Sequence, residues 1–179
     1  MKNKIKNAGI LLTMALGVLL PLTLQASLTL NVGDSAPLFK AKTQDGAEFN
    51  LESRKGKWTI LYFYPKAGTP GCTKQACTFR DNIEKIRAQG AEVYGISADA
   101  VEDQAKFHKE QHLNFDLLAD PDDAVVNLYG SKMPVLKMSK RWTFIVGPDL
   151  KIREIKKDVD PVLDSERTAD EIKNLKSKL

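Results

Sequence analysis

The two cysteines of the chain, Cys72 and Cys77, are the residues best suited to chemistry. Both lie in the segment 64–77, where a predicted strand gives way to a predicted helix. A thiol at the N-terminus of a helix meets the positive end of the helix dipole and unpaired backbone N–H groups, and both favour the thiolate. Because the thiolate is the reactive form of cysteine, the sequence predicts that Cys72 is a nucleophile.

The two sulfur atoms are expected to point in different directions. Four apolar residues recur at helical spacing after Cys72 and form a stripe about 80° wide on the helical wheel: Ala76, Phe79, Ile83 and Ile86. Cys72 projects into this arc, whereas Cys77 lies about 140° away from Cys72 on the same helical wheel. We therefore expect Cys72 to face a sheltered pocket above a sheet and Cys77 to lie toward the flank.

The spacing of the cysteines also limits how they can pair. Five residues of helix separate their Cα atoms by about 8 to 9 Å. A disulfide requires less than about 7 Å, so Cys72 and Cys77 cannot bridge while the helix is intact. A permanent staple would break the element that carries it, whereas a transient catalytic disulfide could use a segment that unwinds.

The loop before Cys72 is built to shape a pocket. Pro65 ends the preceding strand, and Gly68 and Gly71 give the loop conformational freedom, so that backbone N–H groups can point toward the sulfur. Thr69 can place its hydroxyl beside the sulfur as a donor or an acceptor.

A metal site formed by both cysteines with His108 and His112 is an alternative. The two histidines are four residues apart on a predicted helix and could share a face. The gap between the cysteines, however, is at the edge of zinc-ligand spacing, and 30 residues separate Cys77 from His108. We therefore expect ordinary surface histidines and no bound metal.

The elements that position these residues alternate between strands and helices. Residues 58–64 are β-branched and aromatic almost throughout, which is typical of a central strand buried on both faces. A helix is predicted over 73–89, and Gly90 stops it. The remaining pattern predicts strands over 93–97, 115–118, 142–146 and 151–156, helices over 101–111, 120–128 and 164–179, and a loop over 130–140. A succession of this kind that ends in a hairpin predicts an α/β fold with a mixed sheet flanked by helices.

The N-terminal segment is predicted to be a secretory signal peptide. Residues 1–7 carry three lysines and no acid, residues 8–24 are almost wholly apolar, and Leu24-Gln25-Ala26 forms a cleavage site. Cleavage after Ala26 leaves residues 27–179 as a single domain in the periplasm. Contact with a membrane is expected only if the segment stays uncleaved as an anchor.

The charge of the predicted mature chain argues against a nucleic-acid partner. Residues 1–26 contribute three of the 27 basic residues and none of the 23 acidic ones, so the remainder carries a net charge of +1. The lysine runs near the C-terminus are interrupted by other residues and are typical of solvated faces. Nucleic acid is therefore not expected as a partner.

The order Pro65, Thr69, Cys72 resembles the peroxiredoxin signature Pro-x-x-x-Thr-x-x-Cys. The wider stretch 62–81 is similar to the bacterioferritin comigratory protein, or Q-type, branch of that family. The likeness extends in outline from about residue 32 to the C-terminal helix. It implies a thioredoxin-like fold.

The resemblance also implies an activity. Cys72 would attack hydrogen peroxide or an organic hydroperoxide and become a sulfenic acid, and Cys77 would resolve it as a disulfide. A thioredoxin-like protein would reduce that disulfide, with no cofactor. Arg141 stands in the family's Arg-x-Thr-Phe context and would stabilise the thiolate and hold the peroxide oxygens. A monomer or weak homodimer is expected.

The sequence departs from the branch at two places, and two other functions remain open. Gln75 stands where the branch commonly has an acid, and the loop 129–140 is shorter than usual. One alternative is an exported thiol-disulfide oxidoreductase, which would normally have a two-residue gap between its cysteines. The other is a binding module with a permanent structural disulfide.

Overall fold

The structure is a computed structural model that describes residues 29–178. The predicted signal peptide, residues 1–26, lies outside the described residues. Within the described part of the chain, no helix is long and apolar enough to cross a membrane.

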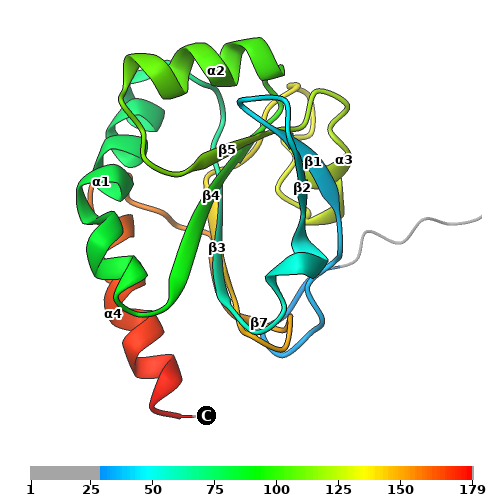
Figure 1. Cartoon of the computed structure of the whole chain (residues 1–179). Helices are drawn as coiled ribbons and strands as arrows, with labels where there is room; N and C mark the ends of the chain where they lie inside the picture. Colours follow the sequence, from blue (N-terminus) through cyan, green and yellow to red (C-terminus); the bar gives the residue numbers. More distant parts are fainter. Residues whose placement is uncertain (1–28, 179) are drawn as a thin grey trace, which may run out of the picture.

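A seven-stranded mixed sheet forms the centre of the molecule (Figure 1). In chain order the strands are β1 Lys40–Thr43, β2 Glu48–Asn50, β3 Trp58–Phe63, β4 Ala91–Ser97, β5 Asp116–Ala119, β6 Trp142–Val146 and β7 Ile152–Lys156. The spatial order is β2-β1-β5-β4-β3-β6-β7. Strands β3, β4 and β5 run parallel, whereas the other neighbours pair antiparallel. The predicted mixed sheet and the terminal hairpin, β6 and β7, are confirmed.

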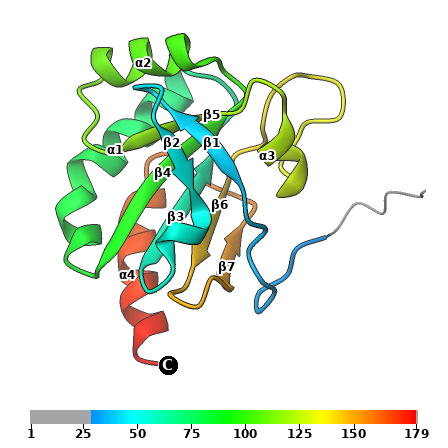
Figure 2. The same ribbon diagram turned by 45° about the vertical axis from the view of Figure 1, so that its right-hand side comes forward.

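Helices cover both faces of this sheet. They are α1 Pro70–Arg87, α2 Val101–Glu110, α3 Ala124–Leu128 and α4 Asp164–Lys176, with a short 3₁₀ helix η1 Leu51–Arg54 before β3. The buried side chains of α1, α2 and α4 join one core cluster, and those of α3 join a second cluster on the opposite face. Figure 2 shows α1 and α4 together on one side of the sheet and α3 on the other.

Strand β3 is interior and buried on both faces, as its sequence predicts. All six of its residues are buried, and β3 lies between β4 and β6. Burial on both faces explains why apolar residues run through the strand without the alternation of a half-exposed one. The C-terminal end of β3 therefore provides a rigid base for the loop that leads to Cys72.

The structure differs from the sequence prediction at two helix starts. Helix α1 begins at Pro70, three residues earlier than predicted, because proline fits the first turn of a helix, where its missing N–H costs nothing. Helix α3 begins at Ala124 and not at Asp120, and the carboxylate of Asp120 accepts a hydrogen bond from the Val126 amide at 2.8 Å. The acids that we expected in its first turn precede the helix.

Strands β1 and β2 were not predicted. They have four and three residues, and the exposed ends of Lys40 and Glu48 form an ion pair at 2.9 Å. Strands this short and polar carry no run of apolar alternation. The pairing of β1 with β5, and of β2 with β1, therefore places them in the sheet, and not the local pattern.

Candidate active site

Cys72 lies in the first turn of α1, just past the C-terminal end of β3. Its side chain is 1% exposed and belongs to the core cluster that contains the apolar stripe of α1. Cys77 is half-buried, and its thiol lies 3.7 Å from Oε1 of Gln111. Both cysteines are free and stand on one unbroken helix. The predicted difference between a sheltered Cys72 and a flanking Cys77 is confirmed.

Arg141 reaches Cys72 from the strand beside β3. Strand β6 pairs antiparallel with β3, with Trp142 opposite Phe63, so the residue before β6 lies at the same edge as the start of α1. Nη2 of Arg141 donates to Sγ of Cys72 at 3.4 Å, across 69 residues of sequence. A Cβ at Gly71 would lie 3.2 Å from this nitrogen, so glycine leaves the guanidinium room to approach.

Gln75 connects Arg141 to the C-terminal helix. Its side chain is wholly buried, and its Oε1 accepts from Nη1 of Arg141 at 2.5 Å. Its Nε2 donates to Oδ2 of Asp164 at 2.8 Å. The sequence singled out Gln75 only as a departure from the branch, and it gave no signal for Asp164, which stands 89 residues further on.

Pro65 and Thr69 belong to the loop between β3 and α1, and the Thr69 hydroxyl bonds to this loop itself. Thr69 is the N-cap residue of α1, and its hydroxyl donates to the Lys66 carbonyl at 3.0 Å. Within residues 29–178 no hydrogen bond joins Thr69 to Cys72. Pro65 follows Tyr64, whose amide still donates to the Ile96 carbonyl of β4 at 3.0 Å, and the Ala67 amide anchors the loop by donating to Asp99 at 2.8 Å.

Two buried tyrosines belong to the same cluster as Cys72. Burial raises the pKa of the Tyr62 and Tyr64 phenols above the usual value. The hydroxyl of Tyr64 donates to Gln104, which is itself wholly buried. Both phenols are therefore neutral at physiological pH and place no negative charge near a Cys72 thiolate.

Comparison with known proteins decides the family. Residues 32–155 match the AhpC/TSA family. Peroxiredoxin Bcp of Escherichia coli strain K12 is 40% identical over 132 residues, which cover 70% of this chain and 85% of that protein. The chain belongs to the peroxiredoxins.

Solved structures agree with this assignment. The crystal structure of peroxidoxin BcpB from Mycobacterium tuberculosis superposes with a TM-score of 0.75 at 30% identity and covers 80% of this chain and 96% of that one. A cysteine-to-serine mutant of PrxQ from Xylella fastidiosa gives a TM-score of 0.77 at 24% identity, with 82% and 98% covered. The predicted thioredoxin-like α/β fold and the Bcp/PrxQ branch are confirmed. This peroxiredoxin is a thiol-dependent peroxidase.

The histidines of this peroxiredoxin do not form the shared face that a metal site would need. His108 lies on α2, but the helix ends at Glu110, and His112 follows it with a φ of 50°. The left-handed backbone at His112 takes its side chain out of helical register with His108. In residues 29–178 no group of three or more histidine, cysteine or acidic side chains is placed to hold a metal ion.

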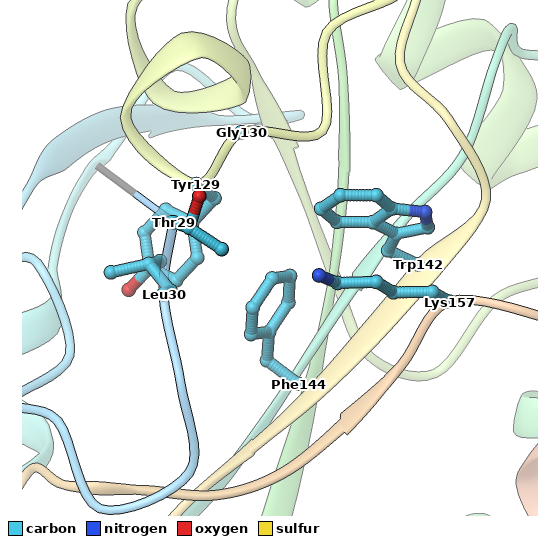
Figure 3. A pocket seen from close by; sticks show the side chains of 7 residues that line it. All are labelled: Thr29, Leu30, Tyr129, Gly130, Trp142, Phe144 and Lys157. Atoms are coloured by element: carbon cyan, nitrogen blue, oxygen red, sulfur yellow. The ribbon is translucent and has the colours of Figure 1, made fainter. Parts of the chain in front are cut away.

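A small pocket lies on the opposite face of the sheet from Cys72. It is lined by residues of the second core cluster and its border: Thr29, Leu30, Tyr129, Gly130, Trp142, Phe144 and Lys157. Figure 3 shows the amine of Lys157 between the rings of Trp142 and Phe144. That amine lies 4.8 Å from the centre of the Trp142 ring, a cation–π contact. None of the predicted site residues lines this pocket.

Proposed function

We propose that Cys72 is the residue of this peroxidase that attacks peroxide. The observation that carries the proposal is the 3.4 Å contact between Arg141 and the Cys72 sulfur at the start of α1. A guanidinium and a helix N-terminus together stabilise a thiolate. The thiolate attacks one oxygen of hydrogen peroxide or an organic hydroperoxide, an S–O bond forms, and the O–O bond breaks. The hydroxide or alkoxide that leaves takes a proton from solvent, and Cys72 becomes a sulfenic acid.

Arg141 and the loop would hold the peroxide during this step. A guanidinium has five N–H donors, so Arg141 can keep its bond to Gln75 and still donate to a peroxide oxygen. The Thr69 hydroxyl can accept a hydrogen bond from the peroxide through its free lone pairs. It can donate one to the peroxide only after its present hydrogen bond to the Lys66 carbonyl breaks. Pro65 would contribute by turning the chain from the end of β3 toward the start of α1, where Cys72 lies.

Cys77 is proposed to complete the cycle. Its thiol attacks the sulfur of the Cys72 sulfenic acid, an S–S bond forms, and the S–O bond breaks with release of water. The first turns of α1 must unwind to bring the two sulfurs together. A thioredoxin-like dithiol protein would then reduce the disulfide by exchange, so the protein itself needs no metal or organic cofactor.

Two substitutions test these roles. Cys72→Ser is expected to lose essentially all peroxide consumption, because a hydroxyl is a far weaker nucleophile at neutral pH. Cys77→Ser is the matched control, which keeps Cys72 and is expected to consume one equivalent of peroxide. Mass spectrometry after dimedone treatment should find the sulfenic acid on Cys72. Peroxide turnover by Cys72→Ser, or no trapped sulfenic acid in Cys77→Ser, would refute the assignment.

The alternatives drawn from the sequence are less well supported. Two free cysteines on one intact helix argue against a binding module with a permanent disulfide. A protein disulfide oxidoreductase would reduce insulin disulfides faster than it consumes peroxide, so comparing the two rates separates it from a peroxidase. We expect peroxide consumption to be the faster reaction.

Export is a further part of the proposal. A basic start, an apolar stretch and a small-residue cleavage site support removal of residues 1–26 and a periplasmic domain over 27–179. The reductant would then be an exported thioredoxin-like protein, and the state of the protein a monomer or weak homodimer.

A further inference from the structure

Gln75 contacts Arg141 correctly in only one orientation of its amide group. The oxygen of a glutamine amide accepts hydrogen bonds, and its nitrogen donates them. The guanidinium of Arg141 can only donate, so Oε1 of Gln75 must face it. The orientation is therefore set by whatever accepts from Nε2, and that group is the carboxylate of Asp164.

Asp164 is built into the structure as an acceptor for four donors. Its side chain lies in the first turn of α4, and the residue is 3% exposed. Oδ2 accepts from Gln75 and from the Thr143 hydroxyl, both at 2.8 Å. Oδ1 accepts from Nζ of Lys156 at 3.3 Å and from the Thr168 hydroxyl at 3.4 Å. An ionised carboxylate has no hydrogen to offer, so it excludes the reversed orientation of Gln75.

We propose that Asp164 is a positioning residue of this peroxidase: by fixing the amide orientation of Gln75, it holds Arg141 against Cys72. The inference rests on the proposed roles of Cys72 and Arg141. Helix α4 contributes no atom to the reacting centre. Through Asp164, however, it controls the position of the positively charged Arg141 guanidinium beside the reactive sulfur. Three direct hydrogen bonds form the path: Gln75 donates to Asp164, and Arg141 donates both to Gln75 and to Cys72.

Lys156 makes the substitution Asp164→Asn informative. An asparagine at this position has one oxygen and one amide nitrogen, and the nitrogen cannot face the ammonium group of Lys156 at low cost. The oxygen therefore stays on the Lys156 side, and the nitrogen faces Gln75. Gln75 must then turn its own oxygen toward residue 164, which points its NH₂ group at Arg141 and breaks the hydrogen bond that holds the guanidinium.

The test measures how fast iodoacetamide alkylates Cys72 as a function of pH, in a Cys77→Ser background. Asp164→Asn should move the midpoint of this profile up by about one pH unit, the size expected for loss of one charge-assisted interaction. At a pH below both midpoints, single-turnover peroxide consumption should fall about tenfold, because one pH unit is a factor of ten in thiolate. The double variant Gln75→Glu with Asp164→Asn should restore both, because a carboxylate at 75 accepts from Arg141 and from the new amide.

A matched control separates positioning from loosening of α4. Asn82→Ala removes another hydrogen bond between α1 and α4, from Asn82 to the Ser165 hydroxyl at 3.1 Å, without touching Asp164. It should lower the melting temperature and leave the alkylation profile in place. An equal shift in Asn82→Ala would show that the effect is merely structural and would overturn the inference.

The remaining outcomes are also decisive. A folded Asp164→Asn protein with the original alkylation midpoint overturns the inference. Should Asp164→Asn not fold, the double variant Gln75→Glu with Asp164→Asn decides, because all its hydrogen bonds can be satisfied. A shifted alkylation midpoint in the double variant, or its failure to fold, overturns the inference. If the alkylation profile shifts as expected but the protein with Asp164 intact does not consume peroxide, the proposed function fails and the positioning role stands.

Discussion

The hydroxyls of Tyr62 and Tyr64 are buried in the same cluster with different consequences. Tyr64 donates to Gln104, whose Nε2 in turn donates to Ser97 at 2.8 Å. The Tyr62 hydroxyl has no hydrogen-bond partner within residues 29–178. A Cβ at Gly95 would lie 2.6 Å from the Tyr62 oxygen, so this hydroxyl occupies the space that the glycine leaves free. An unpaired buried hydroxyl costs about 1–3 kcal/mol.

At this residue scale, Tyr62→Phe is expected to raise the free energy of unfolding by about 1 kcal/mol, because it removes the unpaired group and keeps the ring. Tyr64→Phe is the matched control and should lower the free energy of unfolding by about 1 kcal/mol, since it leaves Gln104 without its donor. Urea unfolding followed by circular dichroism measures both. A loss of stability in Tyr62→Phe as large as in Tyr64→Phe would contradict the prediction.

Among the helices, α1 has a first part that must move, which the hydrogen bond from Gln75 to Asp164 ties to α4 and which unwinding must release, and a middle part that further hydrogen bonds hold. Hydrogen bonds from Thr78 to the Pro161 carbonyl at 3.2 Å and from Asn82 to Ser165 at 3.1 Å tie its middle turns to α4 and the segment before it. Cys72 and Cys77 both precede these ties. Unwinding can therefore stop before the middle turns of α1 and leave the packing of those turns on the sheet intact.

Oxidation by one equivalent of peroxide is accordingly expected to expose amides at the start of α1 and not at its end. Hydrogen exchange measured by mass spectrometry should become at least about tenfold faster over residues 73–77, because opening removes their helical hydrogen bonds. Exchange over 82–87 should stay slow. Cys77→Ser treated in the same way is the control and should keep slow exchange throughout. Unchanged exchange in a protein with a verified Cys72–Cys77 bond would contradict the proposed motion.

At the scale of the whole molecule, the charge balance and the location depend on the N-terminal segment. Removal of residues 1–26 would take away three lysines and leave a nearly neutral protein. Within residues 29–178, the strands of the sheet begin with β1 at Lys40.

Removal of residues 1–26 and export are tested by measuring the intact mass of the protein after the full chain is expressed in a bacterium with a periplasm. We expect the mass of a chain that begins at Ser27, and recovery of that chain from the periplasmic fraction. Replacing Ala26 with Arg should block cleavage and retain the chain at the membrane, because the cleavage site requires small residues. A full-length chain in the cytosol, with either residue at position 26, would contradict export.

Features that depend on local order along the chain follow directly from the amino-acid sequence. The apolar run through β3 and the stripe along α1 predicted both elements, because burial of each imposes its own periodicity. Five residues of helix between the cysteines determined that Cys72 and Cys77 cannot bridge without unwinding. The signature around Cys72 was sufficient for the family.

The groups around the Cys72 sulfur, by contrast, are brought together by the packing of strands and helices. Arg141 meets Cys72 because β6 pairs with β3, and Asp164 meets Gln75 because α4 packs on α1. The tertiary structure also turned the Thr69 hydroxyl toward a carbonyl of its own loop. These contacts join residues far apart in the chain or depend on a single side-chain rotation. Periodicity and spacing report on neighbours along the chain, whereas the environment of a reactive sulfur is set by neighbours in space.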